Sequence, residues 1–181
     1  LIDNGLHGLN ARLVNMPARA MSGSNWTGKE MCWRHAPEQY GAIHLHEDDL
    51  HDCKWQTDFK FTVPDNLASG LYGAKLKCGD QDDTIPFVIC PPKGKNTSEL
   101  CLIIPTFTYI IYANHARPEF GDPWRHRAKD WDAYPWNPGD QPEYGLSTYN
   151  FHTDGSGICH SSALRPILTM RPGYFTFVDQ N

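Results

Sequence analysis

The sequence of 181 residues lacks long apolar runs, and its one local run of basic residues, Arg117 to Lys129, is interspersed with aspartates as on a solvated mixed-charge face. No stretch approaches the ~20 apolar residues that a membrane-spanning helix requires, so we expect no membrane partner. The 16 lysines and arginines are outnumbered by 21 aspartates and glutamates, which gives a formal net charge of −5. A protein that binds nucleic acid neutralises phosphates with clustered basic side chains, so this balance argues against a nucleic-acid partner.

Closely spaced cysteine pairs are also missing. The six cysteines include no Cys-x-x-Cys pair and do not form the dense framework of a small disulfide-stabilised module. Cys78, Cys90 and Cys101 each lie in or beside an apolar run, where a free thiol behaves as a small buried hydrophobe. We therefore predict reduced cysteines and a cytoplasmic location.

The first half of the chain has little helical periodicity and instead shows the patterns of short strands. The segments that alternate apolar and polar residues, or form a short apolar run, are 7–14, 41–46, 57–63, 71–76 and 84–90. The last of them contains Pro86, which has no backbone N–H and therefore suits an edge strand. Short strands joined by polar turns predict a β-sandwich segment over residues 1–92.

The pattern changes after this segment, and we predict a linker over residues 93–98. Leu100–Pro105 is then almost wholly apolar, as in a strand buried on both faces of a parallel sheet. The polar segment Thr106–Tyr109 would lie at the end of this strand, where open α/β sheets bind ligands. Residues 118–142, rich in tryptophan and proline, are expected to form a long irregular loop. These features predict the first part of an α/β catalytic domain over residues 99–181.

The densest group of chemically active side chains lies in Tyr144–Arg165, a serine- and glycine-rich stretch that no hydrophobic core explains. His152, Asp154, Ser156 and His160 suggest a hydrolytic triad, but no Gly-x-Ser-x-Gly elbow surrounds the serine. We interpret His152 and Asp154 as groups that orient a ligand or substrate.

Two tyrosines are candidate metal ligands. Tyr109 directly follows the apolar run, and Tyr149 lies within the polar stretch. A phenolate is a hard anionic donor suited to ferric iron. The alternative, which the abundance of tyrosine in loops favours, is that both rings pack while their hydroxyls form hydrogen bonds.

A second candidate metal site is His44–Asp52, with the sequence HLHEDDLHD. His44 and His46 would share one face of a strand, as two ligands of one ion must. The residue spacing matches no known metal motif, however, and acidic turns after strands are common on protein surfaces. We therefore favour an ordinary solvated turn for this segment.

Four segments resemble the large (β) subunit of the N,N-dimethylformamidase family, in the same order and over nearly the whole chain. They are Asn25–Trp33 (NWTGKEMCW), His35–Asp58 (HAPEQYGAIHLHEDDLHDCKWQTD), Tyr109–Pro118 (YIIYANHARP) and Tyr144–Pro172 (YGLSTYNFHTDGSGICHSSALRPILTMRP). The resemblance implies mixed β and α/β architecture, with an incomplete glutamine-amidotransferase-like (flavodoxin-like) domain after the β-sandwich part. It also implies hydrolysis of a tertiary formamide to a secondary amine and formate, with one iron held by two tyrosines and a glutamate.

Carried over residue by residue, the resemblance implies that Tyr109 and Tyr149 ligate a mononuclear ferric iron (Fe³⁺). Tyr112 is the rival of Tyr109 for the first ligand position. If Tyr109 is the ligand, Tyr112 would orient the ligand or substrate together with Asn114, His152 and Asp154. No glutamate follows Glu143. The resemblance therefore places the glutamate ligand and the catalytic residues beyond Asn181.

The expected function is thus one part of an iron-dependent amidohydrolase that acts on a small linear amide. The chain begins at Leu1, and we expect it to be a fragment that is inactive alone. The resemblance also implies a small helical partner subunit and assembly of several copies. Two alternatives stay open: a non-catalytic module that binds carbohydrate or another protein through its aromatic side chains, or a catalytically degenerate relative.

Overall fold

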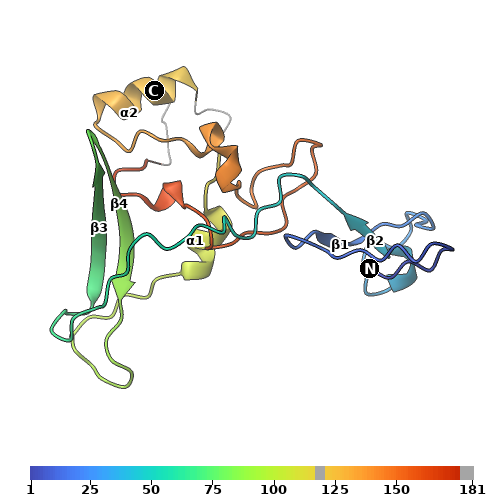
Figure 1. The fold of residues 1–181 in the computed structure, drawn as a ribbon, viewed down its shortest axis with the longest axis horizontal. Helices are drawn as coiled ribbons and strands as arrows, with labels where there is room; N and C mark the ends of the chain where they lie inside the picture. The colour runs from blue at the N-terminus through green and yellow to red at the C-terminus, as the bar shows by residue number, and fades with distance from the viewer. Residues whose placement is uncertain (117–120, 176–181) are drawn as a thin grey trace.

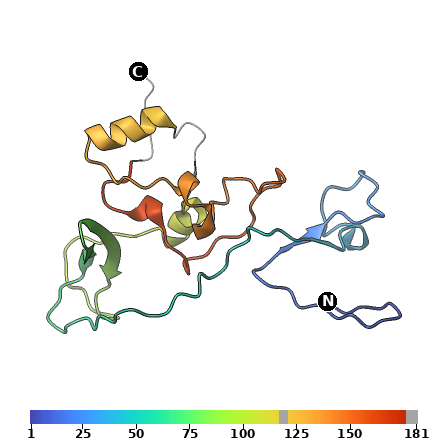
Figure 2. The ribbon, with the colours of Figure 1, turned by 45° about the horizontal axis from the view of Figure 1, so that its top comes forward.

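The computed structural model, which describes residues 1–116 and 121–175, is an extended arrangement of two small sheets and two helices (Figure 1). The antiparallel strands β1 (Ala18–Met21) and β2 (Ala42–His44) form one sheet, and β3 (Gly70–Cys78) and β4 (Gln81–Ile89) form the other. The two sheets lie at opposite ends of the molecule, with helix α1 (Thr106–Tyr112) between them (Figures 1 and 2). Helix α2 spans Asp122–Asp130, and short 3₁₀ turns occupy Pro37–Gln39, Pro138–Asp140, Pro142–Tyr144 and Leu168–Met170.

The β3–β4 hairpin confirms two of the predicted strands. Tyr72, Ala74 and Leu76 alternate with exposed residues and present one half-buried face. A two-residue turn joins the strands, with Gly79 at φ +58°, a conformation that glycine adopts without strain. Pro86 pairs opposite Gly73 in a sheet of only two strands, so it lies in an edge strand as predicted.

Other predicted strands are wrong. Residues 7–14, 57–63 and 100–105 form no strand, and residues 41–46 do so only at Ala42–His44. Leu102 and Phe107 are 79% and 83% exposed, so the predicted buried strand and the polar loop after it are replaced by irregular chain and helix α1. Alternation and apolar runs indicate a face that is suited to burial, but a strand also needs a neighbouring backbone to accept its hydrogen bonds.

Residues 118–142, expected to form an irregular loop, contain helix α2. Residues 118–120 of this segment lie outside the described part of the chain. The local chemistry explains this helix. Pro123 lies in the first turn, where its missing N–H costs nothing, and Asp122 lies at the positive end of the helix dipole. Arg127 and Lys129 lie in the last turn, near the negative end. These signals were present in the sequence and outweigh the prolines that suggested a loop.

The predicted mixed β and helical class is confirmed, but the finer architecture is not. Among residues 1–116 and 121–175 the strands form two separate antiparallel pairs, with neither a sandwich nor a parallel sheet. An ion pair of 2.9 Å between Arg171 and Asp83 connects the hairpin to the C-terminal part of the chain. The division at residues 93–98 stays a prediction.

Little apolar surface is buried within the described residues. The accessible area is 14090 Å², against about 8,800 Å² for a compact monomer of this mass. One small core contains Trp124 and Ala128 at α2, packed against Ala133, Tyr174 and Phe175. Much of the apolar surface is therefore open to contact with other protein.

All six cysteines are free, and Cys78, Cys90 and Cys101 are exposed, so the prediction that these three thiols are buried is wrong. Cys78 is the last residue of β3, Cys90 directly follows β4, and Cys101 lies in irregular chain, where no strand or helix of the described residues covers them. No described helix has the length and apolar composition needed to cross a membrane.

Candidate functional site

Two tyrosine hydroxyls from distant segments meet beside helix α1. Tyr112 lies in the last turn of α1, and its hydroxyl is 3.0 Å from that of Tyr149. The two rings are stacked, with centroids 4.4 Å apart and 13° between their planes, and the His115 ring lies 5.8 Å from that of Tyr149. Both tyrosines are about half exposed, so the paired oxygens are accessible to a ligand.

The loop that carries Tyr149 is attached to the carboxyl end of α1 by hydroxyl groups. A helix of seven residues is too short to be stable alone, and its last carbonyls lack partners within the helix. Ser147 and Thr148 donate hydrogen bonds of 2.7 and 3.1 Å to the carbonyl of Ile111, and Ser161 donates one of 2.6 Å to that of Ile110. These contacts complete the helix end and fix Tyr149 beside Tyr112.

Two buried polar side chains, Asn114 and Arg165, connect the end of α1 to the loop that carries Tyr149. Asn114 is 1% exposed and donates to the carbonyls of Tyr144, Gly145 and Pro166, while its amide oxygen accepts a bond from the Leu168 N–H.

The guanidinium of Arg165 is also buried. It donates to the carbonyls of Ala113, Tyr144, Leu146 and Ser162 and to the Ser161 hydroxyl. Burial lowers the pKa of Arg165 from its ordinary value, and the Cys53 thiol opposes this shift. Asn114 and Arg165 therefore fix the spacing between α1 and the loop of Tyr149. Arg165 and the serines that hold α1 were not singled out individually in the sequence, although the serine content of Tyr144–Arg165 signalled the loop.

Gly145 offers a direct test of this packing. Its φ is +74°, and a Cβ added there would lie 2.6 Å from Nη1 of Arg165. We expect Gly145→Ala to destabilise the protein by about 1–3 kcal/mol, because it combines backbone strain with displacement of a buried guanidinium. Urea unfolding of the complete subunit would measure the change.

A matched control for that substitution is Gly155→Ala. Gly155 has a φ of +83° but no atom within 4 Å of the added Cβ, so it shares the backbone strain without the contact. Equal losses for Gly145→Ala and Gly155→Ala would show that the Arg165 contact contributes nothing.

Electrostatics disfavour ionisation of Tyr149 when no cation is near. The hydrogen bond with Tyr112, repulsion between two phenolates and a small loss of hydration raise the pKa of Tyr149 above its ordinary value. Ionising the Tyr149 hydroxyl at neutral pH would require a positive charge close to its oxygen. This oxygen is therefore suited to a highly charged cation rather than to proton transfer on its own.

The other predicted site residues are more dispersed. Tyr109 lies one turn before Tyr112 on α1, partly exposed, and no contact joins it to Tyr149 among the hydrogen bonds and ring contacts of the described residues. A cavity of about 800 Å³ lies elsewhere, between the β3–β4 hairpin and α2, with Arg125 and Trp136 among its lining residues. Neither Tyr112 nor Tyr149 lines this cavity. We nevertheless place the candidate site at the tyrosine pair, because two adjacent phenol oxygens can ligate a metal ion.

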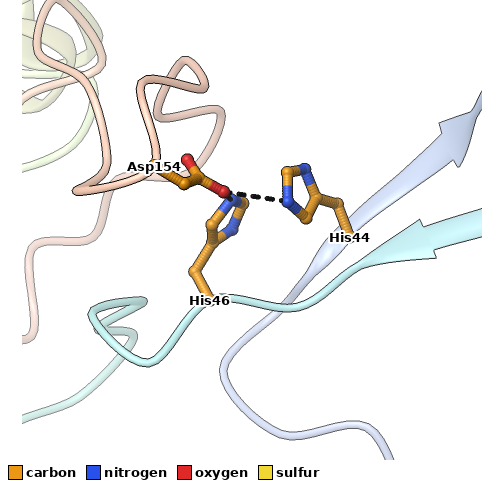
Figure 3. A group of neighbouring side chains, drawn as sticks. All are labelled: His44, His46 and Asp154. Atoms are coloured by element: carbon orange, nitrogen blue, oxygen red, sulfur yellow. Dashed lines mark ion pairs between the residues drawn. The ribbon is translucent and has the colours of Figure 1, made fainter.

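His152 and Asp154 lie in a second cluster, with the segment that follows β2. His152 Nδ1 is 2.6 Å from Asp48, and the rings of His152 and His46 are stacked 3.6 Å apart. Figure 3 shows the rings of His44 and His46 directed at the Asp154 carboxylate, which comes from a separate loop. The predicted role of His152 and Asp154 beside the iron therefore stays a prediction, since their contacts are with this cluster.

Hydrogen bonds from Ser156 keep Asp154 ionised. The hydroxyl and the backbone N–H of Ser156 both donate to this carboxylate and lower the pKa of Asp154 to about 2. The hydrogen of the Ser156 hydroxyl therefore points to Asp154. It points away from His46 Nε2, which lies 2.7 Å from the Ser156 oxygen. Ser156 is therefore not arranged as the nucleophile of a hydrolytic triad.

The chain belongs to the family of proteins related to the β subunit of N,N-dimethylformamidase, as the resemblance predicted. A sequence model of the family described as N,N-dimethylformamidase beta subunit-like, C-terminal, matches residues 18–180. The N,N-dimethylformamidase beta subunit of Paracoccus aminophilus is 42% identical over 185 aligned positions, and that of an Alcaligenes species is 41% identical over 173. Each alignment covers 93% of this chain but 22% of the relative, so the chain spans about a fifth of the length of these curated relatives.

Proposed function

We propose that this chain forms part of an iron-dependent amidohydrolase that cleaves a small linear amide, as N,N-dimethylformamide is, into an amine and a carboxylate. Family membership supports the reaction class. The observation that carries the proposal is the pair of hydroxyls on Tyr112 and Tyr149, 3.0 Å apart although the residues are 37 positions apart in the chain.

The tyrosine pair fits a bound ferric ion in its chemistry and in its spacing. The two hydroxyl oxygens are 3.0 Å apart, close enough for both to contact one metal ion. Two phenolates would also offset much of the ferric charge. The contact favours Tyr112 over Tyr109 as the partner of Tyr149, and Tyr109 stays the rival assignment.

The residues of this chain would hold and orient the reacting groups. Bound iron would supply Lewis-acid polarisation of the amide carbonyl or activation of a water molecule. Ser147 and Thr148 keep the Tyr149 loop against α1, and Asn114 anchors the chain directly after the helix. Such fixed ligands cost little reorganisation during the reaction.

Removal of the phenolic oxygens tests the ligand assignment. We expect Tyr112→Phe and Tyr149→Phe, made in the complete assembled enzyme, to retain less than a tenth of the parent's iron and to lose the phenolate-to-iron absorption. Elemental analysis and visible spectroscopy would measure both.

Tyr109→Phe is the matched control, because it removes the same atom one helical turn away. Iron loss in Tyr109→Phe with full retention in Tyr112→Phe would reverse the assignment of these two residues. A double variant of Tyr112 and Tyr149 that keeps one iron per subunit would contradict the proposal.

We also propose that the whole enzyme contains a small helical subunit and several copies of the subunit to which this chain belongs, in the cytoplasm. The relatives are named as beta subunits, which supports an assembly of more than one kind of chain. The exposed apolar side chains supply surface for such contacts, and the six free thiols suit a reducing compartment.

A further inference from the structure

Two buried histidines and an aspartate form an additional cluster, distinct from the tyrosine pair. His46 Nδ1 lies 3.5 Å from one oxygen of Asp49, and His152 Nε2 lies 3.6 Å from the other. The side chains of His46, Asp49 and His152 are 5%, 8% and 2% exposed. Within residues 1–116 and 121–175, both ring nitrogens lack a hydrogen-bond partner, because these separations exceed the usual range of an N–H···O bond.

The neighbours of the two rings determine which nitrogens carry hydrogen. A carboxylate can only accept, so Asp154 takes the hydroxyl hydrogen of Ser156, and the Ser156 oxygen in turn accepts from His46 Nε2. Asp48 likewise accepts from His152 Nδ1 at 2.6 Å. The remaining nitrogens, which face Asp49, therefore present lone pairs toward a carboxylate.

Lone pairs that face a buried carboxylate repel it unless a positive charge lies between them. Protonation of both rings would place two imidazolium ions in a stack with centroids 3.6 Å apart, which is itself repulsive. A single divalent cation removes both conflicts.

We propose that His46, Asp49 and His152 bind one divalent cation of the zinc class. Ligands about 2.0–2.1 Å from a tetrahedral zinc ion are ~3.3–3.5 Å apart, and one ligand atom from each of the three residues lies within 4.8 Å of the others, so a small adjustment would bring them onto one ion. The rings, now 10° from parallel, would tilt on binding, because a metal lies near the plane of each imidazole that ligates it.

The outer partners fit the same interpretation. Histidines that bind zinc commonly donate their second N–H to a carboxylate or another acceptor, which fixes the ring and strengthens the donor. Asp48 takes this place for His152, and Ser156 with Asp154 takes it for His46.

A cation at this position would join two distant parts of the chain. His46 and Asp49 follow strand β2, whereas His152 lies three residues after Tyr149. The ion would therefore connect the loop that carries Tyr149 to the segment that follows β2. We assign this ion a structural function.

Zinc binding by the complete purified subunit tests the proposal. We expect one zinc ion per subunit, in addition to any iron, after dialysis against zinc chloride and removal of free metal. Cobalt substitution should give the visible absorption of a tetrahedral site. Chelator competition should show at least ~100-fold weaker zinc binding by Asp49→Asn and ~10–100-fold weaker binding by Asp48→Asn.

His51→Ala is the matched control, since His51 belongs to the same segment but contacts His160 instead, and it should bind zinc as the parent does. Asp48→Asn leaves all three ligands in place, so it remains informative if Asp49→Asn fails to fold. A parent subunit that retains no zinc and gives no cobalt spectrum would overturn the proposal. Zinc affinity equal to that of the parent in both Asp49→Asn and Asp48→Asn would overturn it as well. Iron measured on the same samples separates this result from failure of the amidohydrolase proposal.

Discussion

Asn114→Ala should destabilise the complete subunit by about 3–5 kcal/mol. The substitution removes the hydrogen bonds of the side-chain amide to four buried or partly buried backbone groups, among them the bond from the Leu168 N–H at 2.8 Å. It also places alanine at φ +57°, a left-handed conformation that asparagine tolerates better. Calorimetry or a urea titration followed by fluorescence would measure the change.

Two variants separate the causes of that effect. Asn114→Gly removes the side chain without backbone strain, so it should keep most of the destabilisation if the hydrogen bonds dominate. Asn66→Ala removes an exposed asparagine from a turn and should change stability by less than ~0.5 kcal/mol. An Asn114→Gly variant as stable as the parent would refute the role of the buried amide.

Arg165→Met should destabilise the subunit by a similar amount, about 3–5 kcal/mol, and should loosen the loop that carries Tyr149. Methionine retains the apolar volume but donates nothing to the carbonyls of Ala113 and Leu146, which lie on opposite sides of the gap between α1 and the loop. We expect faster amide hydrogen exchange in residues 144–150, together with a lower iron content of the assembled enzyme. Hydrogen-exchange mass spectrometry would localise the effect.

Arg165→Lys is the informative control, because an ammonium keeps the charge but cannot reach several carbonyls from one planar group. It should recover only a small part of the lost stability. Arg12→Met, at an exposed arginine, should leave both stability and exchange unchanged. Full recovery in Arg165→Lys would show that charge alone stabilises this region.

The sequence selected side chains that make specific contacts in the structure, but it could not show which of them lie next to one another. It selected Tyr149, Tyr112, Asn114, His152 and Asp154, and all of them make specific contacts in the structure. Residue type indicates what chemistry a side chain can perform, and polar density indicates where a loop is not core. Neither gives the distance between segments 40 or 100 residues apart, so the pattern alone could not show that His152 contacts Asp48 and His46.

The histidine-rich segment after β2 illustrates the same limit. Taken alone, HLHEDDLHD resembles a solvated acidic turn, because its spacing contains no complete metal motif. The structure brings His152 from more than 100 residues away onto His46 and Asp49 and buries all three. Burial converts ordinary polar residues into an unbalanced group of lone pairs and charge, and only the tertiary structure could show it.

The sequence by itself determined the family, the β3–β4 hairpin and the edge position of Pro86, because these depend on residue identity, local alternation and turn chemistry. It also contained the signals for helix α2, in Pro123 and in the charges at the two helix ends. The tertiary structure decided which apolar runs find a backbone partner, which tyrosine meets Tyr149 and where His152 lies. Those outcomes depend on contacts between distant segments, whose free energy is a property of the assembled chain rather than of any local pattern.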